Sequence, residues 1–465
     1  MVKKIDDATI IIMGMTGDLT RKKLFPAIYR LVKDKKIDKF CLVGVARYKQ
    51  NIDEILSAER KRIGKVERKV WDKLKSVSYY QQLDFYKKDD YNLLKKFLER
   101  VENKHRLSGN RMFYLATLPQ HFDTITENLA ESKLAEENSR KWARVIYEKP
   151  FGDNLKSAQK INRCINRVFK ERQIYRIDHY LGKELVGSIA MMRFTNRVLE
   201  PQWNHRDIES VQIILSENFG VEGRGGFYDK YGVMKDVIQN HALQLLALTA
   251  MEAPKRLDEN CIRTEKAKVL QKTVVKDTIY GQYEGYINEK NVKENSTIPT
   301  FAALRVEINN QRWKGVPFFI KAGKNLDRKE TSIHLKFKKV DCLLSEACPS
   351  DTNCFTMRIQ PNDGFSLELN TKVPGKKNRV TPVEMDFCQK SWFGPNTPEA
   401  YETLLEDVIN GDQSVFVRND EIEHAWKIVE DVLAKKRQVY RYEKKSKGPK
   451  ELKTWSMKNK VGWKA

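Results

Sequence analysis

The first 47 residues hold the pattern that most restricts the fold of this chain. Residues 8–13, ATIIIM, form a short run rich in β-branched side chains, which is typical of a buried parallel strand. The segment GMTGDLTRKKLFPAIYRLV follows with the apolar spacing of an amphipathic helix, and FCLVGVAR, residues 40–47, is a second buried strand. Strand, glycine-containing turn, helix and strand within about 40 residues make a βαβ unit, so we expect an α/β domain at this end of the chain.

The alternation of strands and helices continues to about residue 178. Further strands are expected at RMFYLAT, residues 111–117, and at ARVIYEK, residues 143–149, with helices between them. We predict from this alternation a Rossmann-like, doubly wound domain over residues 1–178 that binds a dinucleotide.

Beyond residue 178 the pattern changes. A helical stretch over about 181–197 is followed by segments of alternating polarity that predict strands, and the turn PNDG at 361–364 joins two of them as a hairpin. Helices are expected at 234–251 and near the C-terminus. We predict an α+β domain over residues 179–465 with a large, mainly antiparallel sheet, whose strands are ESVQIILSE, KVLQKTV, ALRVEINN, VPFFIKA, TSIHLKF, TMRIQ, FSLELNT and VEMDFC.

The composition is that of a globular protein. The chain has 465 residues, too many for one compact core, with 40% hydrophobic and 32% charged residues. No stretch resembles a membrane span or a cleaved signal peptide. The seven cysteines are an odd number without metal-binding spacing. They predict a cytoplasmic protein and no metal site.

The formal net charge of +24 is compatible with nucleic acid, an acidic surface or small anionic ligands. The lysines are spread along the chain rather than gathered in one arm or stripe, which favours a solvated, lysine-rich surface. We therefore expect no nucleic-acid and no membrane partner.

The segment GMTGDL, residues 14–19, lies where the first strand gives way to its helix. Gly14 permits a tight turn, Gly17 lets a pyrophosphate approach the backbone, and the helix start offers N–H groups to phosphate. By itself the segment is a weak signal that a plain glycine turn could also explain, but the surrounding βαβ unit favours a nucleotide site. After the second strand, Arg47 stands where a site selective for NAD has a carboxylate, so we predict NADP with Arg47 holding its 2′-phosphate. The alternative is an ordinary surface arginine.

Two later segments carry further candidate site residues. EKPFG, residues 148–152, follows a buried strand, and Lys149 would extend from the carboxyl end of the sheet, where ligands bind in such folds. RIDHYLGKE, residues 176–184, presents His179, Tyr180 and Lys183 as donors that could surround a phosphate from a helix start. A plain helix capped by Asp178 explains the same letters about equally well.

The segment KDVIQNHALQ contains a candidate base. Histidine titrates near neutral pH, so His241 is suited to take a hydroxyl proton as hydride leaves an alcohol, and Asp178 could stabilise the resulting imidazolium. Asp236 and His241 are five residues apart, which leaves open whether they share a helical face.

Taken together, the sequence resembles the glucose-6-phosphate dehydrogenase family over nearly its whole length. The resemblance rests on GMTGDLTRKKLFPA, NRMFYLA, EKPFG, RIDHYLGKE, ENFGVEGRGGFYD, MKDVIQNHALQ, IKAGKNLDRKE, RIQPNDGFSLELNTKVPG and AYETLLEDVINGDQSVFVRNDEIEHAW, in this order. The nine-residue motif RIDHYLGKE is specific to that family and favours a site over a plain capped helix.

The resemblance implies a role for each matching residue. His241 is similar to the general base and Asp178 to its carboxylate partner. The residues that would bind the substrate are Lys149, His179, Tyr180, Lys183, Glu217, Asp236, Lys324 and Lys329, with Arg328 as an alternative to Lys329. The residues that would bind NADP are Gly14, Met15, Thr16, Gly17, Asp18, Leu19, Arg47, Tyr114 and Lys149.

The resemblance also implies the reaction and the assembly. Glucose 6-phosphate would be oxidised at C1 to 6-phosphogluconolactone, the first step of the oxidative pentose phosphate pathway, with hydride transfer to NADP. Family members associate through the large sheet, so a homodimer is expected, with a tetramer open. Glu330 stands where animal members have a lysine for a second, structural NADP, so the chain resembles the bacterial type and a second NADP is not implied.

Two other functions would fit parts of the sequence. A sugar dehydrogenase of the group that pairs a Rossmann domain with EKP and an open sheet lacks RIDHYLGKE, and activity on an unphosphorylated sugar would favour it. A nucleic-acid-binding protein would show duplex binding with steep salt dependence.

Overall fold

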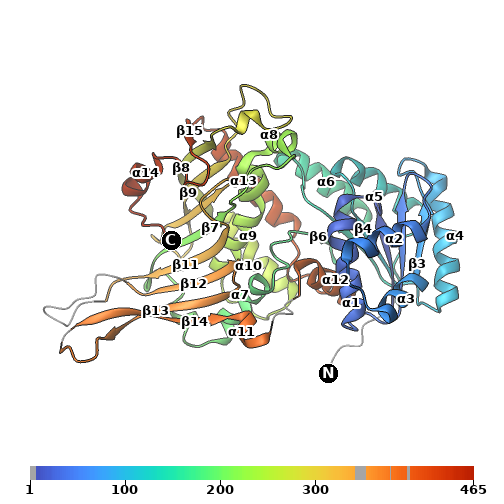
Figure 1. The fold of residues 1–465 in the computed structure, drawn as a ribbon, viewed down its shortest axis with the longest axis horizontal. Coiled ribbons are helices and arrows are strands. Elements are labelled where there is room, and N and C mark those ends of the chain that lie inside the picture. The colour runs from blue at the N-terminus through green and yellow to red at the C-terminus, as the bar shows by residue number, and fades with distance from the viewer. Residues whose placement is uncertain (1–6, 341–351, 378, 395–397, 465) are drawn as a thin grey trace. The chain divides into compact units, whose positions relative to one another are not determined.

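The computed structural model describes residues 7–340, 352–377, 379–394 and 398–464. The chain divides into two compact units, each with its own sheet (Figure 1). The first unit comprises residues 1–184, 258–260 and 398–422, and the second comprises residues 185–257, 261–397 and 423–465.

The first unit has a six-stranded parallel sheet in the order β3-β2-β1-β4-β5-β6. The order reverses between β1 and β4, and ligands bind at the carboxyl ends of the strands beside such a reversal. The expected Rossmann-like sheet is therefore confirmed. Its strands are β1 (Ala8–Met13), β2 (Phe40–Ala46), β3 (Ser78–Gln82), β4 (Arg111–Leu115), β5 (Ala143–Tyr147) and β6 (Ile174–Arg176).

Helices bury both faces of this sheet, which explains why β1, β2 and β4 consist entirely of buried residues. One apolar cluster joins the sheet to α1 (Phe25–Lys33), α2 (Ile52–Ile63), α3 (Arg68–Ser76) and α12 (Ala400–Asn410). The other joins it to α4 (Lys88–His105), α5 (Phe122–Glu131) and α6 (Leu155–Val168). Helix α12 thus belongs to the first unit, although about 220 residues separate it from β6 along the chain.

The second unit has a nine-stranded sheet in the order β14-β13-β12-β11-β7-β10-β9-β8-β15. Its neighbours are antiparallel except for the pairs β7–β10 and β8–β15. The prediction of a large, mainly antiparallel sheet is confirmed. The strands are β7 (Ile208–Ser216), β8 (Thr273–Tyr283), β9 (Phe301–Ile308), β10 (Phe318–Gly323), β11 (Glu330–Phe337), β12 (Cys354–Gln360), β13 (Gly364–Lys372), β14 (Val380–Cys388) and β15 (Val439–Tyr442).

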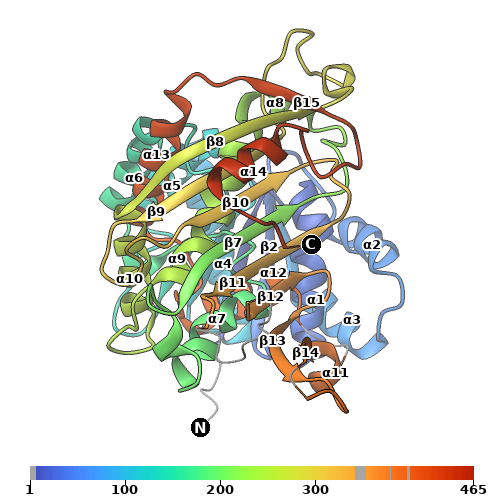
Figure 2. The same ribbon diagram turned by 90° about the vertical axis from the view of Figure 1, so that its left-hand side faces the viewer.

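Helices accompany this sheet as well. Helix α9 (Leu243–Ala250) is buried along its whole length, and α14 (Leu452–Asn459) crosses the sheet over β10, where Trp455 packs against Phe319 (Figure 2). The remaining helices that contribute to this unit are α7 (Glu184–Thr195), α8 (Gly225–Val233), η5 (Met234–Ala242), α10 (Glu259–Gln271), α11 (Gln389–Phe393) and α13 (Asn419–Leu433).

One predicted strand is wrong. KVLQKTV, residues 268–274, was expected to be a strand, but α10 continues to Gln271 and β8 begins only at Thr273. The apolar residues Val269 and Leu270 complete the buried face of the helix that includes Ile262 and Ala267, a helical spacing that the short segment alone does not reveal. Among the described residues, no helix is long and apolar enough to span a membrane.

Candidate active site

The glycine turn after β1 has the tight geometry expected of it. Gly14 has φ +106°, and a Cβ there would lie 2.5 Å from the carbonyl oxygen of Ala116, so glycine is required. The hydroxyl of Thr20 donates to the Gly14 carbonyl at 3.1 Å and ties the turn to the following helix. That helix begins with a π-helical segment, Thr20–Leu24, before α1, and such wide turns are frequent at functional sites.

The other residues of the turn point in different directions. Met15 is buried against Gly44 of β2, where a Cβ would lie 2.4 Å from the Met15 side chain. Asp18 is exposed and accepts a bond from Lys22 at 2.9 Å, which lowers the pKa of its carboxyl. Thr16, Gly17 and Leu19 are partly exposed, so a phosphate could reach the backbone along this side of the turn.

Arg47 follows β2 and is exposed to solvent. Its carbonyl accepts a bond from the Gln82 side chain at 3.0 Å, which fixes the backbone from which the guanidinium extends. Residues 47–50 are Arg, Tyr, Lys and Gln, so no carboxylate is present to repel a 2′-phosphate. Burial lowers the pKa of His121, and the positive charge of Arg47 lowers it further.

Two tyrosines surround a buried carboxylate at the ends of β4 and β5. The hydroxyl of Tyr114 donates to Glu148 at 2.5 Å and that of Tyr401, on α12, donates at 3.3 Å. Burial raises the pKa of Glu148, although both hydroxyls and the charge of Lys149 oppose this shift. Lys149 follows directly and its peptide bond to Pro150 is cis. The Tyr114 side chain is itself buried, and its hydroxyl is engaged by Glu148.

The segment RIDHYLGKE does not form a helix start, so that expectation is wrong. The carboxylate of Asp178 accepts a bond from the Tyr180 N–H at 3.0 Å, and the backbone of residues 178–183 makes consecutive turns before α7 begins at Glu184. An aspartate that bonds the N–H two residues later competes with helix formation, which explains the turns. A Cβ at Gly182 would lie 2.8 Å from the Ala400 carbonyl, so α12 can approach only a glycine here.

These turns bring the three predicted phosphate-binding side chains together. The Lys183 ammonium lies 4.0 Å from the centre of the Tyr180 ring, and the rings of His179 and Tyr180 are 5.1 Å apart. An ammonium, an imidazole and a phenol thus occupy one short segment after β6. This donor set is suited to a phosphate dianion.

In the second unit, Glu217 and Lys324 form an ion pair with N–O distance 2.6 Å. Glu217 follows β7 and Lys324 follows β10. Because these strands are parallel neighbours, the two residues lie side by side at the carboxyl ends of the strands. Lys324 is 7% exposed, and its ammonium lies 5.3 Å from the centre of the Phe219 ring and 5.2 Å from that of Tyr228. The pair is held in a largely desolvated aromatic setting.

Asp236 lies near the same cluster. Burial raises the pKa of Tyr228 well above its usual value, and the charges of Asp236 and Glu217 raise it further. Lys329 is exposed, whereas Arg328 bonds Glu330 at 2.8 Å. Asp236 and Glu217 thus both act on Tyr228, whose ring lies beside the Lys324 ammonium.

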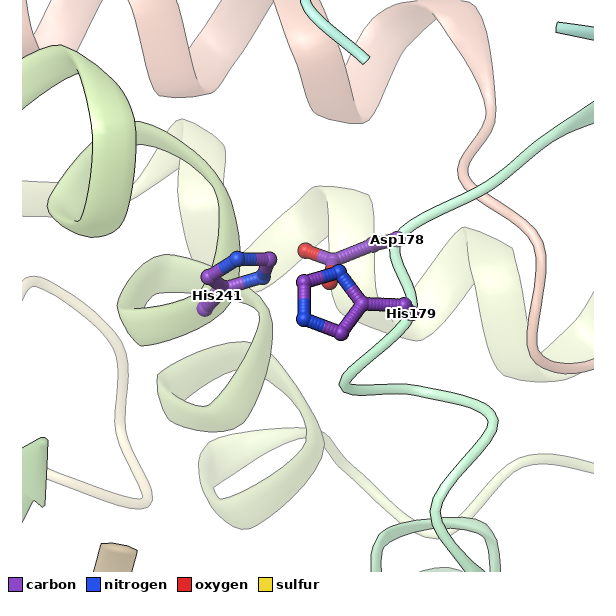
Figure 3. Close-up of side chains that lie close together, drawn as sticks. All are labelled: Asp178, His179 and His241. Carbon is purple, nitrogen blue, oxygen red and sulfur yellow. The ribbon is translucent and has the colours of Figure 1, made fainter. Parts of the chain in front are cut away.

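Asp236 and His241 both lie on η5, a π-helix. Hydrogen bonds in a π-helix run between residues five apart, so these two residues are about one turn apart on it. His241 is 3% exposed, and its backbone N–H donates to the side-chain oxygen of Asn240 at 2.7 Å. Figure 3 labels His241 on this helix and labels Asp178 and His179 on the segment that follows β6 (Figure 3).

The comparisons with known proteins identify the family. Residues 11–187 match the family model described as the glucose-6-phosphate dehydrogenase NAD binding domain, and residues 190–464 match the model of its C-terminal domain. The chain belongs to the glucose-6-phosphate dehydrogenase family. The parallel sheet and glycine turn lie in the first match, and η5 with the Glu217–Lys324 pair lies in the second.

Individual relatives agree with this assignment. Glucose-6-phosphate 1-dehydrogenase of Chlamydia pneumoniae is 41% identical over 95% of this chain and 93% of its own, and that of Bacillus subtilis is 37% identical over 98% of both. A solved structure of glucose-6-phosphate dehydrogenase in complex with glucose 6-phosphate is 33% identical, covers 100% of both chains and has a TM-score of 0.93. Levoglucosan dehydrogenase is 9% identical with a TM-score of 0.54 over 92% of this chain and 97% of its own, which is a likeness of fold alone.

Proposed function

We propose that this protein oxidises glucose 6-phosphate at C1 to 6-phosphogluconolactone and transfers the hydride to NADP. The observation that carries the proposal is the turn at residues 178–183, which gathers three phosphate donors beside a carboxylate in the motif specific to the family. Membership of the family and the similarity to a relative solved with glucose 6-phosphate support the same substrate.

The substrate phosphate is assigned to His179, Tyr180 and Lys183. Lys183 supplies the full positive charge, while the imidazole and the phenol supply directed donors. Contacts to a phosphate so far from C1 position the reacting carbon, and their binding energy is expressed when C1 is oxidised. An unphosphorylated sugar lacks these contacts.

The sugar hydroxyls are assigned to Glu217, Asp236 and Lys324, with Lys149 between sugar and nicotinamide. The ion pair of Glu217 with Lys324 fixes both side chains before the substrate arrives, so little side-chain entropy is lost on binding. Because Arg328 is engaged by Glu330, Lys329 is favoured as the remaining basic contact.

Removal of the proton from the C1 hydroxyl is assigned to His241, which would act as the general base. Asp178 is the carboxylate that would stabilise the resulting imidazolium. A neutral imidazole accepts a proton near working pH, and an adjacent carboxylate favours its charged form. The base must act as hydride leaves C1, since otherwise positive charge develops on the alcohol oxygen.

The dinucleotide is assigned to the glycine turn and the ends of the first sheet. The residues suit NADP because Arg47 is exposed, backbone-anchored and without a neighbouring carboxylate. When bound, NADP accepts the hydride; the chain positions it. The contributing residues are Gly14, Met15, Thr16, Gly17, Asp18, Leu19, Arg47, Tyr114 and Lys149, of which Met15 and Tyr114 have buried side chains.

We also infer a homodimer formed through the large sheet. Strand β14 is an edge strand of this sheet. Met385 on β14 is 63% exposed, and Trp392 and Phe393 on the following helix α11 are 73% and 77% exposed. Phe387 of β14 stacks on Phe365 at 4.7 Å, which makes the apolar patch continuous. An exposed apolar edge of this kind marks an association surface. Sedimentation equilibrium at micromolar concentration is expected to give twice the chain mass of 54.4 kDa.

The cytoplasm is proposed as the place of action.

The function is tested by following the absorbance of NADPH as purified protein reduces NADP. Glucose 6-phosphate is expected to give NADPH, and glucose at the same concentration is expected to give a rate lower by a factor of about 10³ or more, because it lacks the phosphate contacts. Comparable rates with both sugars would contradict the phosphate assignment and favour a general sugar dehydrogenase.

A further inference from the structure

One apolar cluster of the second unit contains four buried tyrosines, and they differ in how their hydroxyls are used. Three of them donate to an oxygen of the protein: Tyr442 to the Lys324 carbonyl at 2.6 Å, Tyr283 to Glu289 at 2.9 Å and Tyr286 to Asp229 at 3.2 Å. The fourth, Tyr228, is 2% exposed, and no group in the described part of the chain forms a hydrogen bond with its hydroxyl. A buried hydroxyl without a partner costs free energy of folding, so its presence calls for an explanation.

The ring of Tyr228 lies beside the ammonium of Lys324. The lysine nitrogen is 5.2 Å from the centre of this ring and 2.6 Å from a carboxylate oxygen of Glu217. An aromatic ring at this distance attracts a cation and helps to hold it in place. None of the contacts proposed above uses Tyr228, although it borders two of the residues assigned to the sugar hydroxyls.

The hydroxyl of Tyr228 is a donor for a carboxylate. Tyr228 lies on α8 and Asp236 on the adjoining η5, and Gly232, with φ +58°, is the break between the two helices. Burial raises the pKa of Tyr228 well above its usual value, and the charges of Asp236 and Glu217 raise it further. The phenol therefore keeps its proton at neutral pH and can donate it in a hydrogen bond.

The ion pair of Glu217 and Lys324 has hydrogen-bonding capacity to spare. An ammonium has three N–H donors, and within the described ranges the only acceptor for that of Lys324 is one oxygen of Glu217. The Glu217 side chain is 29% exposed, so a ligand can reach it. A sugar hydroxyl can accept from the ammonium and donate to the carboxylate at the same time, which weakens the direct bond between the two side chains.

We propose that Tyr228 is a positioning residue for this sugar-binding pair. When a sugar hydroxyl takes up the Lys324 ammonium, the Tyr228 hydroxyl donates to Glu217 and keeps this carboxylate directed at the sugar. Its ring holds the ammonium both before and after the substrate binds. The inference rests on the proposed function, because it deepens the assignment of Glu217 and Lys324 to the hydroxyls of glucose 6-phosphate.

The proposal explains why the hydroxyl is unpaired in the free protein. Its acceptor becomes available only in the substrate complex, so the cost of burying the hydroxyl is met when the chain folds and its hydrogen bond contributes to substrate affinity. A hydrogen bond to a charged carboxylate is among the stronger ones in proteins. Loss of this bond should therefore weaken substrate binding without weakening the fold.

Tyr228→Phe tests this expectation, because it keeps the ring beside Lys324 and removes only the hydroxyl. The KM for glucose 6-phosphate is expected to rise at least about tenfold, with kcat changed by less than about threefold. The Tm of the free protein is expected not to fall, since no hydrogen bond of that state is lost. The rise in Tm on addition of glucose 6-phosphate without NADP reports binding alone, and it is expected to shrink in this variant.

Tyr286→Phe is the matched control. Its ring lies 6.3 Å from that of Tyr228 in the same cluster, but its hydroxyl is already bonded to Asp229. This variant is expected to lower the Tm and to leave the KM for glucose 6-phosphate within about threefold. The same result for Tyr228→Phe, a lower Tm with an unchanged KM, would overturn the proposal.

A double variant tests whether Tyr228 acts through Glu217. In the Glu217→Gln background the acceptor is a neutral amide, so adding Tyr228→Phe is expected to raise the KM by less than about threefold more. An equal tenfold rise in both backgrounds would overturn the step through Glu217. NADPH formation by the unmodified protein with an unchanged KM in Tyr228→Phe would overturn this inference alone, whereas no NADPH from glucose 6-phosphate with the unmodified protein would overturn the proposed function and this inference with it.

Discussion

The two sheets of this protein are built differently, yet their candidate site residues lie in equivalent places. The sheet of the first unit is parallel throughout and buried on both faces, and its candidate residues follow β1, β2, β4, β5 and β6. The sheet of the second unit is mainly antiparallel, but Glu217 and Lys324 follow its parallel pair β7–β10. The carboxyl ends of two antiparallel neighbours point in opposite directions. Only a parallel pair of neighbouring strands therefore brings two carboxyl ends together.

The two sheets also differ in how much of their surface is left for contact with another chain. Helices cover both faces of the first sheet, which leaves the strand ends as its functional surface. In the second sheet, β14 and part of β13 are exposed, and apolar side chains gather beside that edge. One region of the same sheet is thus assigned to substrate and another to a second chain.

The largest expected effect concerns a residue that lies on neither sheet. His241→Asn keeps a polar, hydrogen-bonding side chain but removes the base, so kcat is expected to fall by about 10²–10⁴-fold. The KM for glucose 6-phosphate should change little, because the phosphate contacts remain. Steady-state kinetics at saturating NADP measures both constants, and His205→Asn, a histidine outside the proposed site, is the control.

A kcat within a factor of about three of the unmodified protein would contradict the base assignment. A normal kcat with a raised KM would instead assign His241 to binding.

The second prediction tests the parallel pair β7–β10. Glu217→Gln leaves the nearly buried Lys324 ammonium without its counter-charge, and an unpaired buried charge costs about 3 kcal/mol. The free energy of unfolding should fall by about that amount, and the KM for glucose 6-phosphate should rise at least about tenfold. Urea denaturation and initial rates provide the two measurements.

The control for this prediction is Glu209→Gln on the same strand. Glu209 pairs with Lys336 at 3.0 Å, but that pair is exposed, so its loss is expected to cost less than about 1 kcal/mol. An equal fall in the free energy of unfolding in the two variants would show that the Glu217–Lys324 pair contributes no more to stability than an exposed ion pair.

The sequence predicted well where short segments determine structure. The β-branched runs of β1 and β2 and the glycine between strand and helix are local signals, and they predicted the parallel sheet and the turn at Gly14. The hairpin at PNDG is likewise local, because its turn residues lie between two alternating segments. The family motifs indicated the remaining site residues by resemblance rather than by spacing.

Contacts over long sequence separations could not be predicted in the same way. Nothing near Tyr401 indicates that its hydroxyl donates to Glu148, 253 residues earlier. The π-helical form of η5, which places Asp236 and His241 about one turn apart, depends on packing rather than on residue preference. The turns of residues 178–183 arise because the Asp178 side chain competes with helical hydrogen bonding, and the motif alone was equally compatible with a helix.

The third prediction concerns the first sheet alone. Arg47→Gln removes the guanidinium after β2, so the KM for NADP is expected to rise by about 10–100-fold while that for NAD changes little. Lys49→Gln, two residues further along the exposed segment, is the matched control and should alter the KM for NADP by less than about threefold. Initial rates with each cofactor give the ratio. An equal loss with NAD and NADP would show that Arg47 supports the loop rather than the 2′-phosphate.

The smallest expected effect lies on α12, which completes the burial of the first sheet. Burial raises the pKa of Asp407 to about 8, and the nearby carboxylates of Asp412, Glu406 and Glu184 add to the shift. Between about pH 4 and pH 8 the folded protein therefore binds a proton that the unfolded chain has released, and stability falls as pH rises through this window. Asp407→Asn removes that loss, so the free energy of unfolding should exceed that of the unmodified protein at pH 8 and nearly equal it at pH 4. Thermal unfolding across this range measures the difference, with the exposed Glu99→Gln on α4 as control. A gain independent of pH would mean that the aspartate is charged in the folded protein throughout, and that α12 buries its face less completely than the packing of the first sheet implies.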